Sequence, residues 1–333
     1  MNKKVTIDKF DLKLLSILEQ DARQSLSSMA KQLHTSQQVV SYRMQSLEKK
    51  SIIENYYCLI DIAKLGYTSY RTMVRLTNIN EQKKQQILDY LLKHGNVLWL
   101  VEVGGKWNLL INFMAQDILH YSNILREFKN KFPDQIQNYD VLTTIEGFYF
   151  GRDYFTKDKR DRKKQIIFGG QLINKLEIDN LDFKILQHFS EHGRINAIDI
   201  AHKAKVSPNT IILRIKSLKD RQVIKGFKPL IHLDKLGYQG YKALIKFQNI
   251  TELKEKKIIQ EIQEYIEVVG VIRLVGLWDF EIEFEVKNQE EMLKLTRKLR
   301  DLLNDVVKEF EVLPLYQEYK YNFFPSDILL KNN

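Results

Sequence analysis

The chain has 333 residues, a formal net charge of +10, 44% hydrophobic residues and one cysteine, Cys58. This composition excludes a chain that is disordered throughout, and the lone cysteine excludes a disulfide framework or a thiolate metal cluster. No apolar run approaches the roughly 20 residues of a membrane span and the N-terminus lacks a signal-peptide pattern, so we expect a cytoplasmic protein without membrane contact.

The same sequence pattern occurs twice. Residues 7–70 and 178–241 align without a gap at a constant shift of 171. Repeat units in solenoids span only about 20–50 residues, so this longer repeat predicts a duplicated pair of domains. The excess positive charge favours a polyanionic partner such as nucleic acid.

Each copy begins with a pattern typical of three helices. Asp8 and Asp179 are candidate N-caps of the first helix, and a short second helix is expected at residues 27–33 and 197–204. Ser36 and Ser207 are candidate N-caps of the third helix. A short β-hairpin is expected next, at residues 53–60 and 224–233. Three helices followed by a hairpin describe a winged helix-turn-helix.

The rest of each copy predicts the order βαββαβ, which is the ferredoxin-like unit. In the first copy, strands are expected at residues 71–78, 97–103, 107–114 and 136–147, with helices at 81–93 and 117–132. In the second copy, strands are expected at residues 242–249, 268–275, 278–286 and 306–319, with helices at 252–265 and 289–303.

The predicted fold class is therefore α+β, with two tandem copies of a winged helix-turn-helix followed by a ferredoxin-like domain. The expected boundaries are residues 1–62 and 63–150 for copy one, 151–175 for a basic linker, 176–233 and 234–325 for copy two, and 326–333 for a tail. The linker carries six basic and two acidic residues between Thr156 and Gln165. This run either adds salt-sensitive DNA affinity or is a solvated spacer.

Several short motifs occur in the same order and spacing in both copies. They are D-x-x-D-x-K-[LI]-L at Asp8–Leu15 and Asp179–Leu186, Arg23 and Arg194, S-x6-R at Ser36–Arg43 and Ser207–Arg214, and K-L-G-Y at Lys64–Tyr67 and Lys235–Tyr238. This pattern resembles the Lrp/AsnC (feast/famine) family of transcription regulators. The resemblance implies a winged helix that binds double-stranded DNA, and a ferredoxin-like domain that dimerises and senses an effector.

The third helix of copy one is the expected recognition helix, because Val40, Met44 and Leu47 predict its buried face. Arg43 is interpreted either as a phosphate contact or as half of a structural ion pair. The candidate DNA-contacting residues in this copy are Ser36, Gln37, Gln38, Ser41, Tyr42, Arg43 and Gln45.

Copy two carries Ile212 and Leu213 where copy one has Ser41 and Tyr42. Its helix is therefore expected either to contact a different, thymine-rich half-site or to pack against protein instead of DNA. The candidate DNA-contacting residues in this copy are Ser207, Asn209, Thr210, Arg214 and Lys216.

The resemblance also implies a G-D-Y-D loop that binds an amino-acid-like effector. Here the loops read Gly105-Lys106-Trp107-Asn108 and Gly276-Leu277-Trp278-Asp279, so the first acid is missing from both. The candidate effector residues are Gly105, Trp107, Asn108, Gly276, Trp278 and Asp279. The alternative for both tryptophans is a core or interface position.

The strand at residues 280–286 alternates strictly and places Glu281, Glu283 and Glu285 on one face. It is expected to pair with the strand that carries Lys242, whereas copy one has Leu110 and Asn112 at the equivalent places. Unlike sheet faces favour an intramolecular pseudo-dimer of copy one with copy two, and higher homo-oligomers remain open.

Other function classes are less well supported by the sequence. Sirohaem decarboxylases resemble the same family, but their expected M-x-H-G segment reads Met114-Ala115-Gln116 here. His188 and His192 have metal-compatible helical spacing without a third ligand nearby, so neither a metal site nor a cofactor is expected. The main prediction is a non-enzymatic DNA-binding regulator; a decarboxylase-like enzyme and a protein-interaction module are the alternatives.

Overall fold

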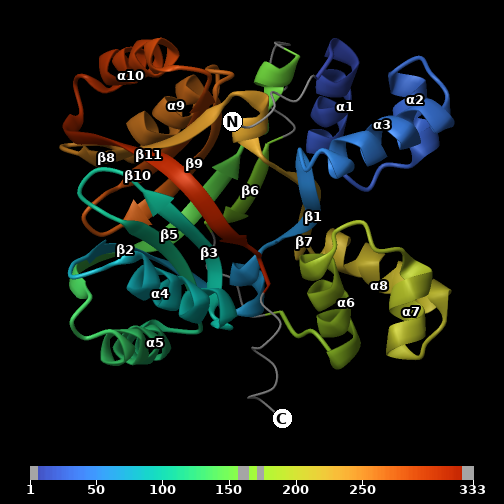
Figure 1. Cartoon of the computed structure of the whole chain (residues 1–333), viewed down its shortest axis with the longest axis horizontal. Helices are drawn as coiled ribbons and strands as arrows, with labels where there is room; N and C mark the ends of the chain where they lie inside the picture. Colours follow the sequence, from blue (N-terminus) through green and yellow to red (C-terminus); the bar gives the residue numbers. More distant parts are fainter. Residues whose placement is uncertain (1–6, 157–164, 171–175, 325–333) are drawn as a thin grey trace.

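A computed structural model describes residues 7–156, 165–170 and 176–324 (Figure 1). The first copy contains α1 (Lys9–Gln20), α2 (Leu26–Gln32), α3 (Gln37–Lys49), β1 (Ile53–Ile60), β2 (Thr68–Leu76), α4 (Glu81–Lys93), β3 (Val97–Val103), β4 (Leu109–Ala115), α5 (Ile118–Lys131) and β5 (Ile136–Tyr149). Strand β6 (Ile166–Gly169) follows. The second copy contains α6 (Asn180–Glu191), α7 (Ala197–Ala204), α8 (Pro208–Asp220), β7 (Ile224–Ile231), β8 (Gln239–Phe247), α9 (Glu252–Ile262), β9 (Val268–Val275), β10 (Phe280–Val286), α10 (Gln289–Leu303) and β11 (Val307–Tyr321).

Local capping explains why the helices begin where the sequence predicts. The Asp8 carboxylate accepts a hydrogen bond from the backbone N–H of Asp11, and the Asp11 carboxylate accepts one from the backbone N–H of Asp8, which forms a capping box. Asp179 caps α6 by accepting from the backbone N–H groups of Leu181 and Asp182. In the K-L-G-Y motifs, Gly66 and Gly237 have φ angles of +80° and +75°, which glycine adopts without steric cost. The motif therefore ends a short 3-10 turn in each copy.

The expected hairpin after each third helix is wrong. Each copy supplies one strand there, and β1 pairs antiparallel with β7 of the other copy, with Tyr57 opposite Lys228. Asn55 lies inside β1 and Gly226 lies inside β7, so neither segment turns back on itself. The strand periodicity was sufficient to predict β structure, but it does not specify a partner that lies 171 residues away.

The two ferredoxin-like domains merge into one closed β structure. Within the described residues, the sheet has nine strands in the order β2-β4-β3-β11-β8-β10-β9-β5-β6, and β2 also pairs with β5. This last pairing closes the sheet into a ring that contains each of its nine strands except β6. The final strand of each copy crosses to the other copy: β5 pairs with β9, and β11 pairs with β3.

Helices cover the outside of this ring while apolar and charged side chains fill its inside. Helices α4 and α5 lie on the copy-one half, and α9 and α10 lie on the copy-two half (Figure 1). The winged helices stand beside the ring and share one apolar core, which includes Leu15, Leu186 and Phe227. No helix in the described ranges is long and apolar enough to span a bilayer.

The segment expected as a linker is largely incorporated into the fold where it is described. Tyr154 and Phe155 are buried in the winged-helix core, and β6 pairs with β5. Most of the basic run, at residues 157–164, and the expected tail lie outside the described residues.

Candidate nucleic-acid interface

Helix α3 presents a polar outer face. Val40, Met44 and Leu47 are buried, which confirms the predicted inner face, and Tyr42 is 70% exposed. Ser41 is half-buried. The exposed polar residues along the helix are Gln37, Gln38, Tyr42 and Gln45. Their amide and hydroxyl groups can hydrogen-bond base edges or phosphates.

Helix α8 presents a different face. Ile212 and Leu213 are 54% and 67% exposed, although apolar side chains of this size usually avoid water. Asn209 and Lys216 are exposed beside them. Thr210 is half-buried, and its hydroxyl lies 2.8 Å from the Ser207 hydroxyl. The two candidate recognition helices therefore occupy equivalent positions in the two copies but expose different kinds of side chain.

Ser36 and Ser207 hold the starts of these helices. The Ser36 hydroxyl accepts from the Val39 backbone at 3.3 Å, and the Ser207 hydroxyl accepts from the Thr210 backbone at 3.1 Å. Both serines are exposed at the N-terminal end, where a phosphate would meet unpaired backbone N–H groups.

Arg43 and Arg214 occupy equivalent ion pairs. Arg43 Nη1 lies 2.8 Å from Asp8 Oδ2 and 3.3 Å from Asp11 Oδ1. Arg214 Nη2 lies 2.7 Å from Asp179 Oδ2. A backbone hydrogen bond from Asp11, with a smaller contribution from Arg43, lowers the pKa of Asp8. Each arginine thus ties its third helix to the cap of the first helix, so the geometry supports the structural interpretation.

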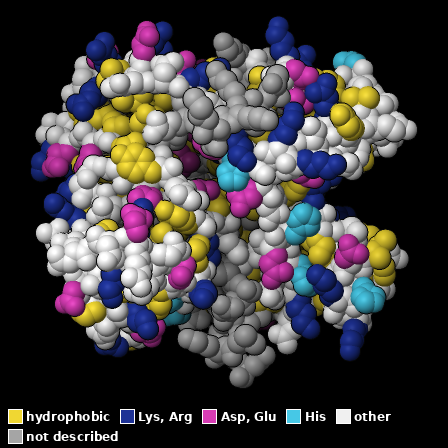
Figure 2. All heavy atoms as spheres, in the orientation of Figure 1, with side chains coloured by type: hydrophobic (Ala, Val, Ile, Leu, Met, Phe, Trp, Pro, Cys, Tyr) yellow, Lys and Arg dark blue, Asp and Glu magenta, His cyan; other side chains and the backbone are white. Residues whose placement is uncertain are grey.

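Basic residues surround both winged helices in Figure 2, where a notch separates the two lobes. Lys49 and Lys50 are exposed at the C-terminal end of α3. In copy two, Arg221 Nη1 instead lies 3.6 Å from Asp182 Oδ2, and Arg221 also donates to the Glu177 carbonyl. In copy two, Arg221 therefore stabilises the winged helix itself.

A reciprocal arginine contact joins the two winged helices, and the sequence analysis missed its role. Arg23 donates to the carbonyls of Gly193 and Ile195 at 2.9 and 2.6 Å, while Arg194 donates to the Ala22 carbonyl. The recurrence of these arginines was visible, but their partners were not. Together with the β1–β7 pairing, they fix the relative placement of α3 and α8.

The two candidate effector loops are built into the fold. Trp107 and Trp278 are only 1% and 4% exposed and pack in the apolar cluster between the copies. Gly105 and Gly276 have φ angles of +90° and +147°, as the tight turns between strands require.

Asn108 and Asp279 occupy matching positions in these loops. Asn108 Oδ1 accepts from the Leu76 backbone at 2.7 Å, and Asp279 Oδ2 accepts from the Phe247 backbone at 2.8 Å. Asp279 also pairs with Lys246 at 2.8 Å. Both side chains therefore secure the end of the first strand of their own domain.

Family models match both winged-helix segments. Residues 7–48 match an AsnC-type helix-turn-helix domain, and residues 178–225 match a winged helix-turn-helix DNA-binding domain. The duplication seen in the sequence is thus present in the matches.

Two relatives each match less than half of this chain. An uncharacterized HTH-type transcriptional regulator of Pyrococcus furiosus is 33% identical over 128 residues, which cover 37% of this chain and 82% of that protein. The leucine-responsive regulatory protein of Rhizobium meliloti is 30% identical over 67 residues, covering 20% of this chain and 43% of that protein.

The fold of the whole chain is similar to that of a protein of known structure. The siroheme decarboxylase NirDL superposes with a TM-score of 0.62 over 96% of this chain and 94% of its own. Its sequence identity is 13%, so the likeness concerns the fold: two winged helices beside two joined ferredoxin-like domains.

Proposed function

This chain belongs to the Lrp/AsnC family of helix-turn-helix transcription regulators, and we propose that it binds double-stranded DNA through two unlike winged helices. One observation carries the proposal: the β1–β7 pairing fixes α3 and α8 relative to each other, but the two helices expose different side chains. A symmetric dimer of two identical chains, each with one winged helix, would present two identical recognition helices and bind a palindromic DNA site. This chain instead presents two different recognition surfaces.

In this proposal, α3 enters the major groove and α8 enters a second segment of groove. Gln38 and Tyr42 would contact base edges or phosphates, since glutamine pairs bidentately with adenine. Ile212 and Leu213 would contact thymine methyl groups, while Lys216 would pair with a phosphate. Lys49 and the net charge of +10 add sequence-independent affinity.

Ligand control is the finer part of the proposal. Among the loops at residues 105–108 and 276–279, the copy-two loop carries a carboxylate, Asp279, which an ammonium group would need. Lys246 already pairs with this carboxylate. An amino-acid-like effector would therefore compete with Lys246, and Lys246→Met should increase effector binding in calorimetric titrations.

Selection of binding sites from random duplex DNA with the full chain tests the main proposal. We expect a sequence with two unlike half-sites, bound with affinity that falls steeply as salt rises. Selection of a symmetric palindrome would contradict the proposal that the two recognition helices bind different sequences. Absence of salt-sensitive binding would instead favour a protein-interaction module, for which exposed Ile212 and Leu213 would be the contact surface.

A sirohaem-decarboxylase-like enzyme is the second candidate, and the whole-chain fold likeness favours it. The test is an absorption spectrum of the full chain after incubation with sirohaem and gel filtration. A retained haem-type band with release of carbon dioxide would support the enzyme, whereas an unchanged protein spectrum would count against it.

A further inference from the structure

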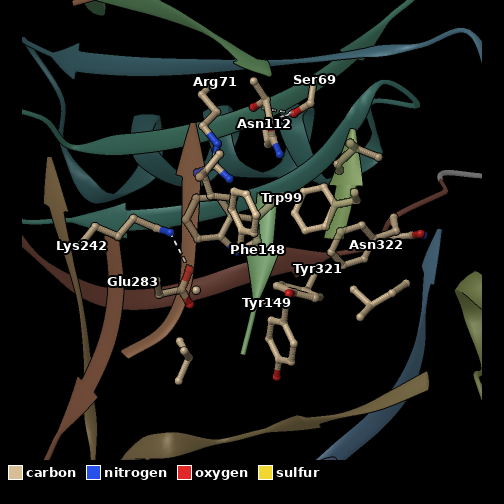
Figure 3. Close-up of a pocket in the computed structure, with 18 residues that line it drawn as sticks. Ser69, Arg71, Trp99, Asn112, Phe148, Tyr149, Lys242, Glu283, Tyr321 and Asn322 are labelled. Atoms are coloured by element: carbon tan, nitrogen blue, oxygen red, sulfur yellow. Dashed lines mark hydrogen bonds and ion pairs between the residues drawn. The ribbon is translucent and has the colours of Figure 1, made fainter. Parts of the chain in front are cut away.

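The closed β ring contains a cavity that belongs to neither candidate site. Its volume is about 100 Å³, and side chains of both copies line it. Figure 3 shows Ser69, Arg71 and Asn112 on one side, Tyr149 and Tyr321 on the other, and Trp99 between them. The cavity is distinct from the loops at residues 105–108 and 276–279.

Charged groups at the cavity are paired with one another. Arg71 Nη1 lies 2.6 Å from both carboxylate oxygens of Glu281. Lys242 Nζ lies 2.5 Å from Glu281 and 2.7 Å from Glu283. The carboxylates therefore already have cationic partners, and they do not require a cationic ligand.

Hydrogen-bond donors remain beside these pairs. Arg71 Nε is buried, and no group among the described residues accepts its hydrogen. The Asn112 carbonyl oxygen accepts from the Ser69 hydroxyl, which leaves the Asn112 NH₂ group as a donor; Figure 3 shows it turned toward the aromatic rings. A buried donor without a partner is unfavourable, and an acceptor inside the cavity would relieve it.

The opposite wall is aromatic and apolar. Trp99 is 9% exposed, and Lys242 Nζ lies 4.7 Å from its ring centroid. Phe148 and Tyr321 also line the space. Such walls suit a short hydrocarbon body whose polar end faces Arg71 and Asn112.

From this arrangement we infer that the ring binds a small carboxylate with a short apolar chain. The carboxylate accepts from Arg71 Nε and Asn112 Nδ2, and the chain packs on Trp99. An apolar cavity of roughly 150 Å³ holds benzene, so about 100 Å³ suits a ligand of about five non-hydrogen atoms, the size of propionate. The inference does not depend on DNA binding.

Calorimetric titration of the full chain with sodium propionate at constant ionic strength tests this site. We expect saturable one-to-one binding, and we expect propionamide to bind at least about tenfold more weakly because it lacks the charge. Arg71→Lys keeps a cation for Glu281 but removes the unpaired donor. It should weaken propionate binding at least about tenfold.

Asn112→Asp provides a second variant that keeps the side-chain shape while it replaces a donor with a negative charge. It should also lose at least about tenfold in affinity, whereas Asn138→Asp on the exposed part of β5 should bind as the unmodified chain does. Thermal unfolding of each variant establishes that it is folded. No saturation in the millimolar range, or equal binding by Asn112→Asp and Asn138→Asp, would overturn the inference.

Discussion

Basic residues serve two different purposes in the first winged helix, and Arg43 illustrates the structural one. It ties α3 to the cap of α1 through Asp8 and Asp11, whereas Lys49 is exposed at the end of α3. We expect Arg43→Met to lower the free energy of unfolding by about 1 kcal/mol, since the ion pair is partly exposed and supports a helix cap. Urea denaturation measures this loss.

The salt dependence of DNA binding separates this structural role from a phosphate contact. Lys49→Ala should reduce the slope of log affinity against log salt by about 1, because one phosphate contact is removed. Arg43→Met should leave that slope unchanged. A reduction by about 1 in the Arg43 variant would show that the arginine also binds phosphate.

Gln38 and Tyr42 are the residues by which copy one would distinguish bases. We expect the double variant Gln38→Ala, Tyr42→Ala to relax preference in one half-site, at a cost of about 1–3 kcal/mol per lost base contact. Repeating the site selection with this variant measures the change. The matched control is Ile212→Ala with Leu213→Ala, which should affect the other half-site; altered preference in the same half-site would contradict the assignment of one helix to each.

Glu318 gives the ring a pH-dependent contribution to stability. Its Oε2 accepts from Trp99 Nε1 at 2.6 Å, and although the residue as a whole is exposed, desolvation of the carboxyl group and the nearby Glu283 charge raise its pKa from 4.5 to about 7. The folded state thus favours the protonated form. Its stabilising contribution is complete below about pH 4.5 and is lost as pH rises toward about 7.

Glu318→Gln removes the titrating group and should flatten this part of the pH profile. Urea unfolding at a series of pH values between 4.5 and 7 for both chains measures the difference. Parallel profiles would contradict the assignment to Glu318, because other groups would then cause the dependence.

At the scale of elements, Arg152 joins the winged helix of copy one to the sheet of copy two. The guanidinium lies 2.6 Å from Glu19 on α1 and 2.8 Å from Glu285 on β10, and both carboxylates are almost fully buried. Removing one member of a buried pair leaves an uncompensated charge. Glu19 also accepts from the Tyr149 hydroxyl at 2.7 Å, so the end of β5 takes part in the same junction.

Arg152→Met should therefore lower the free energy of unfolding by about 3–5 kcal/mol. Lys256→Met, which breaks an exposed helical pair with Glu252, should leave the free energy of unfolding nearly unchanged. Chemical denaturation of both variants makes the comparison. A similar small change in each would show that the Arg152 junction does not hold the elements together.

Sequence alone predicted helices better than strand partners, for a physical reason. The start of α8 follows from Ser207 and Pro208, which act through neighbouring backbone atoms. The partner of β1 depends on a strand far along the chain, so alternation at residues 53–60 suggested a local hairpin that does not exist. Likewise, the pairing of Glu283 with Lys242 was predicted within one domain, but the contact between Arg71 and Glu281 crosses copies and was not.

At the scale of the whole molecule, the copies are joined mainly by strands rather than by the connecting peptide. β5 and β11 each pair with both copies. We expect a chain with a protease recognition sequence inserted within residues 157–164 to remain one particle after cleavage. Gel filtration with light scattering before and after cutting measures this, and separation into two half-size species would contradict it.

The exchange of final strands also determines which molecules this protein can associate with in a cell. A regulator assembled from separate identical chains can trade subunits with related chains, and its DNA specificity then varies with their relative abundance. Here the final strand of each copy already pairs with an edge strand of the other copy, since β5 pairs with β9 and β11 pairs with β3. Because α3 and α8 belong to one chain, they are always made in a one-to-one ratio. Their pairing therefore does not depend on how strongly one-copy relatives are expressed.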